Sequence, residues 1–192
     1  MAGSKPYIVG VGGTASPTSS TEQALRFALG QAEKLGARTR LFGGGELMDL
    51  PHYLHSDCRD HAGALELVQE LRAADGVIIA SPGYHGNISG LVKNALDYTE
   101  EMARDERPYF DGLAVGIIAT AYGWQAACNT LSALRSITHA LRGWPTPLGV
   151  AINTATPVFR DDDCIDADIQ KQMQVMVDQV VRFGVGRGAV VT

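Results

Sequence analysis

Six hydroxyl side chains crowd the turn GTASPTSST, residues 13–21, which follows the apolar run Tyr7–Val11 and precedes a helical pattern. A helix N-terminus leaves about four N–H groups unpaired and carries a partial positive charge, so it can bind phosphate without a cationic side chain. One or two hydroxyls would suffice to cap the helix. The surplus favours a phosphate site formed by Thr14, Ser16, Ser19, Ser20 and Thr21.

Two other phosphate motifs fit this turn less well. Gly10 to Ala15 matches G-x-G-x-x-A, but a dinucleotide fingerprint should open its helix at the second glycine. Here the chain continues as a loop through Ser16, Pro17 and Thr18. A Walker loop needs a lysine, and this segment has none.

Two later turns combine aromatic rings with glycines. Ser81–Asn87 reads SPGYHGN, and we expect Pro82 to end strand pairing. The glycines at 83 and 86 would let a flat ligand approach the backbone, while Tyr84 and His85 supply ring surface. The turn TAYGW, residues 120–124, repeats the pairing of a ring with a glycine. Together these turns indicate a planar ligand.

The elements that must position these turns are an alternation of strands and helices. Five short, continuous apolar runs predict strands buried on both faces, at 7–11, 39–42, 76–80, 113–119 and 148–152. Apolar residues at helical spacing predict helices at 21–35, 64–74, 91–102, 128–141 and 169–183, with a frayed tail at 184–188. This order predicts an α/β, doubly wound fold with a parallel sheet, and ligands bind such sheets outside the carboxyl ends of the strands.

Length and composition limit the classes of function. The chain has 192 residues, which fits one domain over 1–192. Its net charge of −5 and lack of a basic block argue against nucleic-acid binding. Three widely spaced cysteines argue against a disulfide scaffold and favour a reducing cytoplasm. We see no signal peptide and no apolar run long enough to span a membrane.

Two further patterns contain metal-ligating residue types, but we do not predict a metal site from either. His52, His55, Cys58 and His61 recur every third residue, whereas zinc sites usually combine close ligands with distant ones. The aspartates at 161–163, 166 and 168 do not fit an EF-hand, which requires a glycine at its sixth position. We expect them to cap the last helix.

The segment SPGYHGNISGLVKNALDY, Ser81–Tyr98, resembles the signature S-P-x-Y-x-G-x-x-x-G-x-x-K-N-x-L-D of the NADPH-dependent FMN reductase family. The hydroxyl turn is similar to the family's phosphate loop, and the match in order and spacing covers about residues 5–155. The resemblance implies a three-layer flavodoxin-like fold with a five-stranded parallel sheet of order 2-1-3-4-5. It also implies a homodimer or homotetramer, with the helix at 91–102 in the interface near Lys93 and Asp97.

The same resemblance assigns the turns to FMN. The hydroxyl residues named above would hold its phosphate, and two further groups would flank its isoalloxazine ring: Pro82, Gly83, Tyr84, His85 and Gly86 on one side, and Thr120, Ala121, Tyr122 and Gly123 on the other. Many members carry arginine where Ser16 stands and glutamate where Gly83 stands. The first loop and the helix after Trp124 look most like the alkanesulfonate-associated FMN reductases, which treat flavin as a substrate.

The expected activity is hydride transfer from NADPH or NADH to flavin N5, which needs no catalytic acid–base residue because the flavin carries the chemistry. Reduced flavin would then pass to an acceptor such as a flavin-dependent monooxygenase. The alternatives are an enzyme that retains FMN and reduces quinones, azo dyes or metal oxyanions, a flavodoxin-type electron carrier, and a phosphate-binding module without flavin.

Overall fold

A parallel β-sheet forms the centre of the molecule in the computed structural model, which describes residues 5–16, 18–56, 58–160 and 163–188. Its strands follow the order β2-β1-β3-β5-β6. The bounds are β1 (Tyr7–Gly12), β2 (Arg38–Phe42), β3 (Gly76–Tyr84), β5 (Ala114–Ala121) and β6 (Trp144–Pro145). Two further strands join this sheet, β4 (Asn87–Ile88) against β3 and β7 (Val150–Asn153) against β5, while β8 (Phe159–Arg160) and β9 (Asp163–Cys164) form a separate hairpin.

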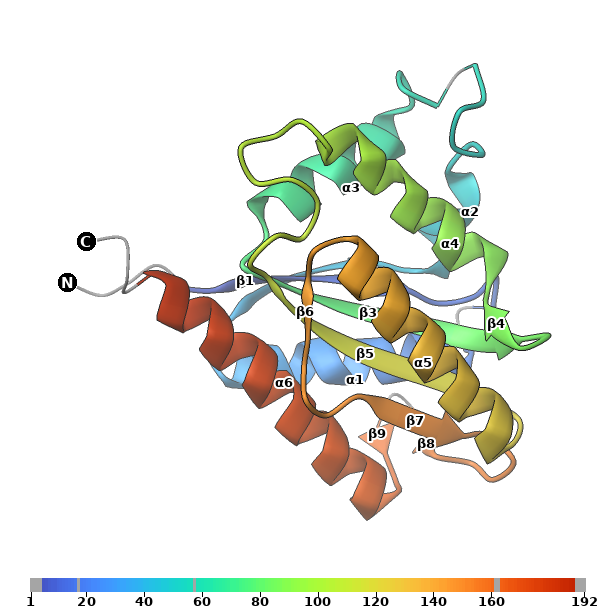
Figure 1. Ribbon diagram of the computed structural model, residues 1–192. Helices are drawn as coiled ribbons and strands as arrows, with labels where there is room; N and C mark the ends of the chain where they lie inside the picture. The colour runs from blue at the N-terminus through green and yellow to red at the C-terminus, as the bar shows by residue number, and fades with distance from the viewer. Residues whose placement is uncertain (1–4, 17, 57, 161–162, 189–192) are drawn as a thin grey trace.

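Helices cover both faces of the sheet (Figure 1). One face carries α3 (Ala62–Ala73), α4 (Gly90–Asp97) and α5 (Trp124–Ala140), together with the short helix α2 (Gly44–Asp49). The other face carries α1 (Ser20–Lys34) and α6 (Ala167–Gly188). The molecule therefore has three layers, as the predicted doubly wound fold requires.

The two cores follow from the alternation of side chains along each strand. In β1, Ile8 packs into the core beneath α1 and α6, whereas its neighbour Val9 packs into the core beneath α3, α4 and α5. Both side chains are fully buried. This two-sided burial explains why the strands read as continuous apolar runs.

The expected five-strand sheet differs from the observed one in detail. Within the described residues the sheet has seven strands, because β6 and β4 add to the five predicted ones, while the strand predicted at 148–152 is β7. The strands β6 and β7 pair with successive parts of β5 along the same edge. The order of the five principal positions agrees with the predicted 2-1-3-4-5 arrangement.

The prediction that Pro82 ends strand pairing is wrong. Strand β3 continues to Tyr84, and Pro82 is the partner of Thr120 in β5. Strand β1, on the other side of β3, has already ended at Gly12 opposite Ala80. Pro82 therefore lies where only one neighbouring strand remains, a position in which a residue without an N–H is tolerated.

Helix boundaries also correct the sequence-based expectations. The helix predicted at 91–102 is α4 followed by a 3₁₀ segment, η1 (Tyr98–Met102). The residues 184–188, predicted to fray, continue α6. Asp166 caps α6 as expected, since its Oδ1 accepts from the N–H groups of Asp168 and Ile169 at 3.0 Å, whereas Asp161 and Asp162 lie outside the described residues.

None of the helices in the described part of the chain combines the length and the apolar character needed to cross a bilayer.

Candidate functional site

Two glycines turn the chain out of the sheet at the end of β1. Gly12 and Gly13 have φ angles of +154° and +123°, which L side chains rarely adopt. A Cβ on Gly12 would lie 2.0 Å from the Ala80 carbonyl oxygen. This close approach to β3 requires glycine. The hydroxyl-rich turn at residues 13–21, called the hydroxyl loop below, starts directly after it.

The hydroxyl loop uses several of its side chains to hold its own shape. Thr14 Oγ1 and the backbone of Ser16 exchange two hydrogen bonds of 3.1 Å, and Ser16 Oγ lies 3.2 Å from Thr18 Oγ1. Ser19 is the N-cap of α1, where its Oγ accepts from the Glu22 N–H at 3.2 Å. Ser16 is exposed, and Thr14, Ser19 and Ser20 are half-buried. The hydroxyls of these four residues thus lie at an accessible helix N-terminus.

Thr21 differs from the other hydroxyl residues because its side chain is buried. Its Oγ1 lies 2.6 Å from Thr120 Oγ1, and both residues are buried. The structure thus brings together one residue expected at the phosphate and one expected at the ring. Their hydroxyls bond each other, which links the start of α1 to the end of β5.

The second turn is a tight β-hairpin. Tyr84 pairs with Asn87, so only His85 and Gly86 form the connection between β3 and β4. Both have positive φ, +50° and +88°, as two-residue hairpin turns of type I′ require. Tyr84, His85 and Gly86 are exposed, whereas Pro82 is buried, so Pro82 can reach a ligand only through its backbone.

Gly83 faces the protein rather than open space. A Cβ on Gly83 would lie 2.4 Å from Thr130 Oγ1 and 3.3 Å from the Ala126 carbonyl oxygen, both in α5. Packing against α5 therefore requires a glycine here, and the approach of a flat ligand to the backbone of Gly83 stays a prediction. Gly86 has no atom within 4 Å of such a Cβ among the described residues, so it does leave room.

The third turn presents two exposed aromatic side chains around a glycine. Tyr122 is 83% exposed and Trp124 58% exposed, while Gly123 between them has φ +111°. The Gly123 N–H donates to Asn153 Oδ1 at 2.9 Å, so the end of β7 braces this turn. Ala121 is buried in β5.

These three turns lie along one edge of the sheet. Strands β1, β3 and β5 are neighbours and run parallel, so their carboxyl ends meet there. The partnership of Pro82 with Thr120 places the two aromatic turns on adjacent strand ends.

Sequence reasoning missed three residues that shape these turns. Glu22 is buried and bonds Gly44, Asn153 braces Gly123, and Thr130 packs beneath Gly83. The run Gly43-Gly44-Gly45 after the second strand was the available signal for the first of these. Long-range contacts such as Asn153 with Gly123 leave no local pattern.

The fold agrees with the comparison with known families. Residues 6–157 match the family described as NADPH-dependent FMN reductase. The chain belongs to this family.

Relatives of this family member include the FMN-dependent NADPH-azoreductase of Staphylococcus aureus, which is 32% identical over 121 residues. That match covers 62% of this chain and 61% of the azoreductase, so it spans about three fifths of the relative's length.

Solved structures share the fold. The flavoenzyme NAD(P)H:(acceptor) oxidoreductase FerB from Paracoccus denitrificans superimposes with a TM-score of 0.73 at 21% identity, covering 94% of this chain and 98% of FerB. The apo form of the NADH:FMN oxidoreductase EmoB gives a TM-score of 0.70 at 20% identity, covering 95% of this chain and 90% of EmoB.

The residues of this FMN reductase family member fit FMN by their donor chemistry. The accessible N-terminus of α1, with hydroxyls around it, suits a phosphate dianion. The exposed rings of Tyr84 and Tyr122 stand at neighbouring strand ends and suit a planar heterocycle. Among the described residues, no group of three or more His, Cys, Asp or Glu side chains is placed to hold a metal ion.

Proposed function

We propose that this protein is an NAD(P)H-dependent FMN reductase. The observation that carries the proposal is the convergence at one sheet edge of an accessible, hydroxyl-rich helix N-terminus with two aromatic turns, in a member of this family. Bound FMN would supply the redox chemistry by accepting a hydride at N5 and passing two electrons to an acceptor.

The protein's own residues would bind and orient the flavin. Thr14, Ser16, Ser19 and Ser20, which lie at or near the N-terminus of α1, would donate to the phosphate through hydroxyl and backbone groups. The hydroxyl of Thr21 is bonded to Thr120, so we assign these two residues to positioning α1 against β5. No side chain is needed as an acid or base, because hydride transfer between the two cofactors involves no proton held by the protein.

The backbone of the β3–β4 hairpin and of the third turn would flank the ring. His85 and Gly86, which form the turn of this hairpin, would offer N–H groups beside the exposed Tyr84, and oriented amides stabilise the negative charge of a reduced flavin. Tyr122 and Gly123 would flank the opposite side, with Thr120 and Ala121 contributing only backbone atoms because their side chains are buried.

A steady-state assay tests the proposal. Purified protein should oxidise NADPH or NADH in proportion to added FMN, and riboflavin, which lacks the phosphate, should be a poorer substrate. If neither nicotinamide is oxidised with FMN, FAD, riboflavin, a quinone or an azo dye present, the enzyme proposal is wrong. If calorimetry detects no binding of FMN, the remaining hypothesis is the phosphate-binding module without flavin.

A second candidate is an enzyme that retains FMN and reduces azo dyes or quinones. The 32% identity to the Staphylococcus aureus azoreductase favours it. Colour separates the two: a yellow protein after gel filtration supports retained FMN, whereas a colourless protein that needs added FMN supports flavin as a substrate. A yellow protein without reductase activity would instead support the electron carrier.

The assembly and setting of the enzyme are further parts of this proposal. The family resemblance favours a cytoplasmic homodimer or homotetramer that supplies reduced flavin to a flavin-dependent monooxygenase. Lys93 and Asp97 in α4 form an ion pair of 2.5 Å. We propose that this ion pair lies near the subunit interface. The mass of the native protein by light scattering tests the oligomeric state.

A further inference from the structure

Glu22 is a carboxylate buried beside the hydroxyl loop. It lies in the first turn of α1, where an acidic residue normally stays in water and stabilises the helix dipole. Here the residue is only 3% exposed. Because burying a carboxylate is unfavourable without hydrogen-bond partners, its position requires an explanation.

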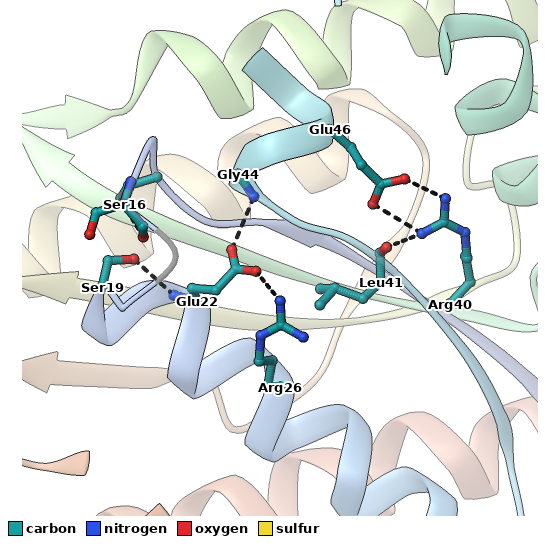
Figure 2. A network of polar contacts seen from close by, with 9 residues as sticks. Ser16, Ser19, Glu22, Arg26, Arg40, Leu41, Gly44 and Glu46 are labelled. Carbon is teal, nitrogen blue, oxygen red and sulfur yellow. Dashed lines mark hydrogen bonds and ion pairs between the residues drawn. The ribbon is translucent and has the colours of Figure 1, made fainter. Parts of the chain in front are cut away.

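The partners of Glu22 come from two directions (Figure 2). Its Oε2 accepts from the Gly44 N–H at 3.0 Å, and its Oε1 accepts from Arg26 Nη2 at 2.8 Å. Gly44 is the first residue of α2 and is buried, whereas the Arg26 side chain is 47% exposed. The carboxylate therefore ties α1 to the segment that follows β2.

Glycines form the walls around this carboxylate. A Cβ on Gly13 would lie 2.2 Å from Glu22 Oε2, and one on Gly43 would lie 2.5 Å from Oε1. A Cβ on Gly44 would lie 1.6 Å from the carbonyl oxygen of Thr14. The segment after β2 thus packs directly onto the start of the hydroxyl loop, with Glu22 between them.

We infer that Glu22 is a positioning residue for the phosphate loop, which fixes Gly43 and Gly44 against Gly13 and Thr14. The inference rests on the proposed FMN-binding function. Stabilisation of the helix dipole alone would need neither burial nor a bond to another segment. The contacts of Glu22 instead support the backbone from which the loop directs its N–H and hydroxyl groups.

Removal of the carboxylate should loosen that backbone. Without the Glu22 side chain, the buried Gly44 N–H loses its acceptor and a void opens beside Gly13. Flavin binding through the phosphate should weaken, whereas binding through the ring should persist, because the carboxylate of Glu22 bonds Gly44 and Arg26, which belong neither to the β3–β4 hairpin nor to the third turn.

The test compares dissociation constants for FMN and riboflavin, measured by quenching of flavin fluorescence. Glu22→Ala should weaken FMN binding about tenfold, the loss expected for one unsatisfied buried donor, and leave riboflavin binding within about twofold. Glu22→Gln keeps an oxygen acceptor for Gly44 and should stay within about threefold of the wild type for FMN. Glu33→Ala, an exposed glutamate in the same helix, is the matched control and should change neither constant.

Several results would overturn the inference. These are an equal loss of FMN and riboflavin binding in Glu22→Ala, no loss of either, tighter FMN binding, or a Glu22→Gln variant as weak as Glu22→Ala. If Glu22→Ala does not fold, Glu22→Asp, one methylene shorter, should show the same selective loss to a smaller extent. A wild-type protein that binds riboflavin as tightly as FMN would instead overturn the phosphate site itself, before any variant is made.

Discussion

Thr21 Oγ1 lies 2.6 Å from Thr120 Oγ1, although 99 positions separate the two residues in the chain. This contact joins the N-terminal end of α1 to the end of β5, so it couples the hydroxyl loop to the third turn. Both hydroxyls are buried and depend on each other as partners.

The first prediction concerns this threonine pair. Thr21→Val keeps the shape of the side chain but leaves the Thr120 hydroxyl buried without its partner, so the free energy of unfolding should fall by about 1–3 kcal/mol. The double variant Thr21→Val/Thr120→Val removes both polar groups and should recover most of that loss. Urea unfolding of the wild type, both single variants and the double variant measures the coupling. Losses in the double variant equal to the sum of the single losses would contradict a direct bond.

The second prediction concerns Gly83, which lies against α5. Gly83→Ala places a Cβ 2.4 Å from Thr130 Oγ1, so the Thr130 side chain must turn away or β3 and α5 must move apart, and the free energy of unfolding should fall by about 1–3 kcal/mol. Thermal unfolding measures this loss. The second variant Gly83→Ala/Thr130→Ala removes the obstructing side chain and should recover part of the stability. An unchanged melting temperature for Gly83→Ala would show that the contact with α5 is not as close as described.

The packing of α5 against Gly83 accounts for the glycine at this position. The family resemblance led us to expect glutamate at this position, but here a side chain would meet Thr130 and the backbone of Ala126. In this chain, the start of α5 therefore occupies the space beside β3 that a larger residue would need. The difference became interpretable only once the position of α5 was known.

Much of the fold followed from local patterns in the sequence. The run Tyr7–Val11 is apolar throughout because β1 is buried on both faces, and this signal does not depend on distant contacts. The end of β3 was missed because a proline usually marks the end of a strand, whereas Pro82 pairs on one side only.

The site was predictable only in part. Hydroxyls next to a helix start were readable as a ligand loop, since capping and phosphate binding use the same groups. The burial of Thr21 and Glu22 was not readable, because each is determined by a contact with a distant segment, at Thr120 and Gly44. No local motif marks Thr120, and the three consecutive glycines at 43–45 do not by themselves identify Glu22 as the partner of Gly44.

The third prediction is a loss of stability at alkaline pH through Tyr7. Burial and the hydrogen bond that its hydroxyl donates to Glu70 raise the pKa of Tyr7 to about 12, with the charges of Arg38 and Arg40 opposing this. The folded state therefore holds the phenol proton more tightly than the unfolded state, whose tyrosine pKa is about 10. This stabilisation is fully present below pH 10 and is lost as the pH rises towards 12.

The pH prediction is tested with Tyr7→Phe. Between pH 9 and pH 11 the free energy of unfolding of the wild type should fall by roughly 1.4 kcal/mol more than that of Tyr7→Phe, as a pKa difference of two units implies. Urea unfolding at the two pH values measures the free energy of unfolding of both proteins. The effects of the other titrating groups are common to both and cancel in the difference. Parallel losses in the two proteins would exclude Tyr7 as the source.

The last prediction separates the two parts of the proposed flavin site. Asn153 Oδ1 accepts from the N–H groups of Gly123 at 2.9 Å and Ala155 at 3.0 Å, so Asn153→Ala frees the third turn. Because that turn is proposed to flank the ring, binding of FMN and of riboflavin should weaken together, by about five- to tenfold. Asn153→Asp keeps the acceptor oxygen and should bind nearly as the wild type does. Asn129→Ala, an exposed site in α5, controls for the loss of an amide. A loss confined to FMN would place Asn153 with the phosphate loop and contradict the assignment of the third turn to the ring.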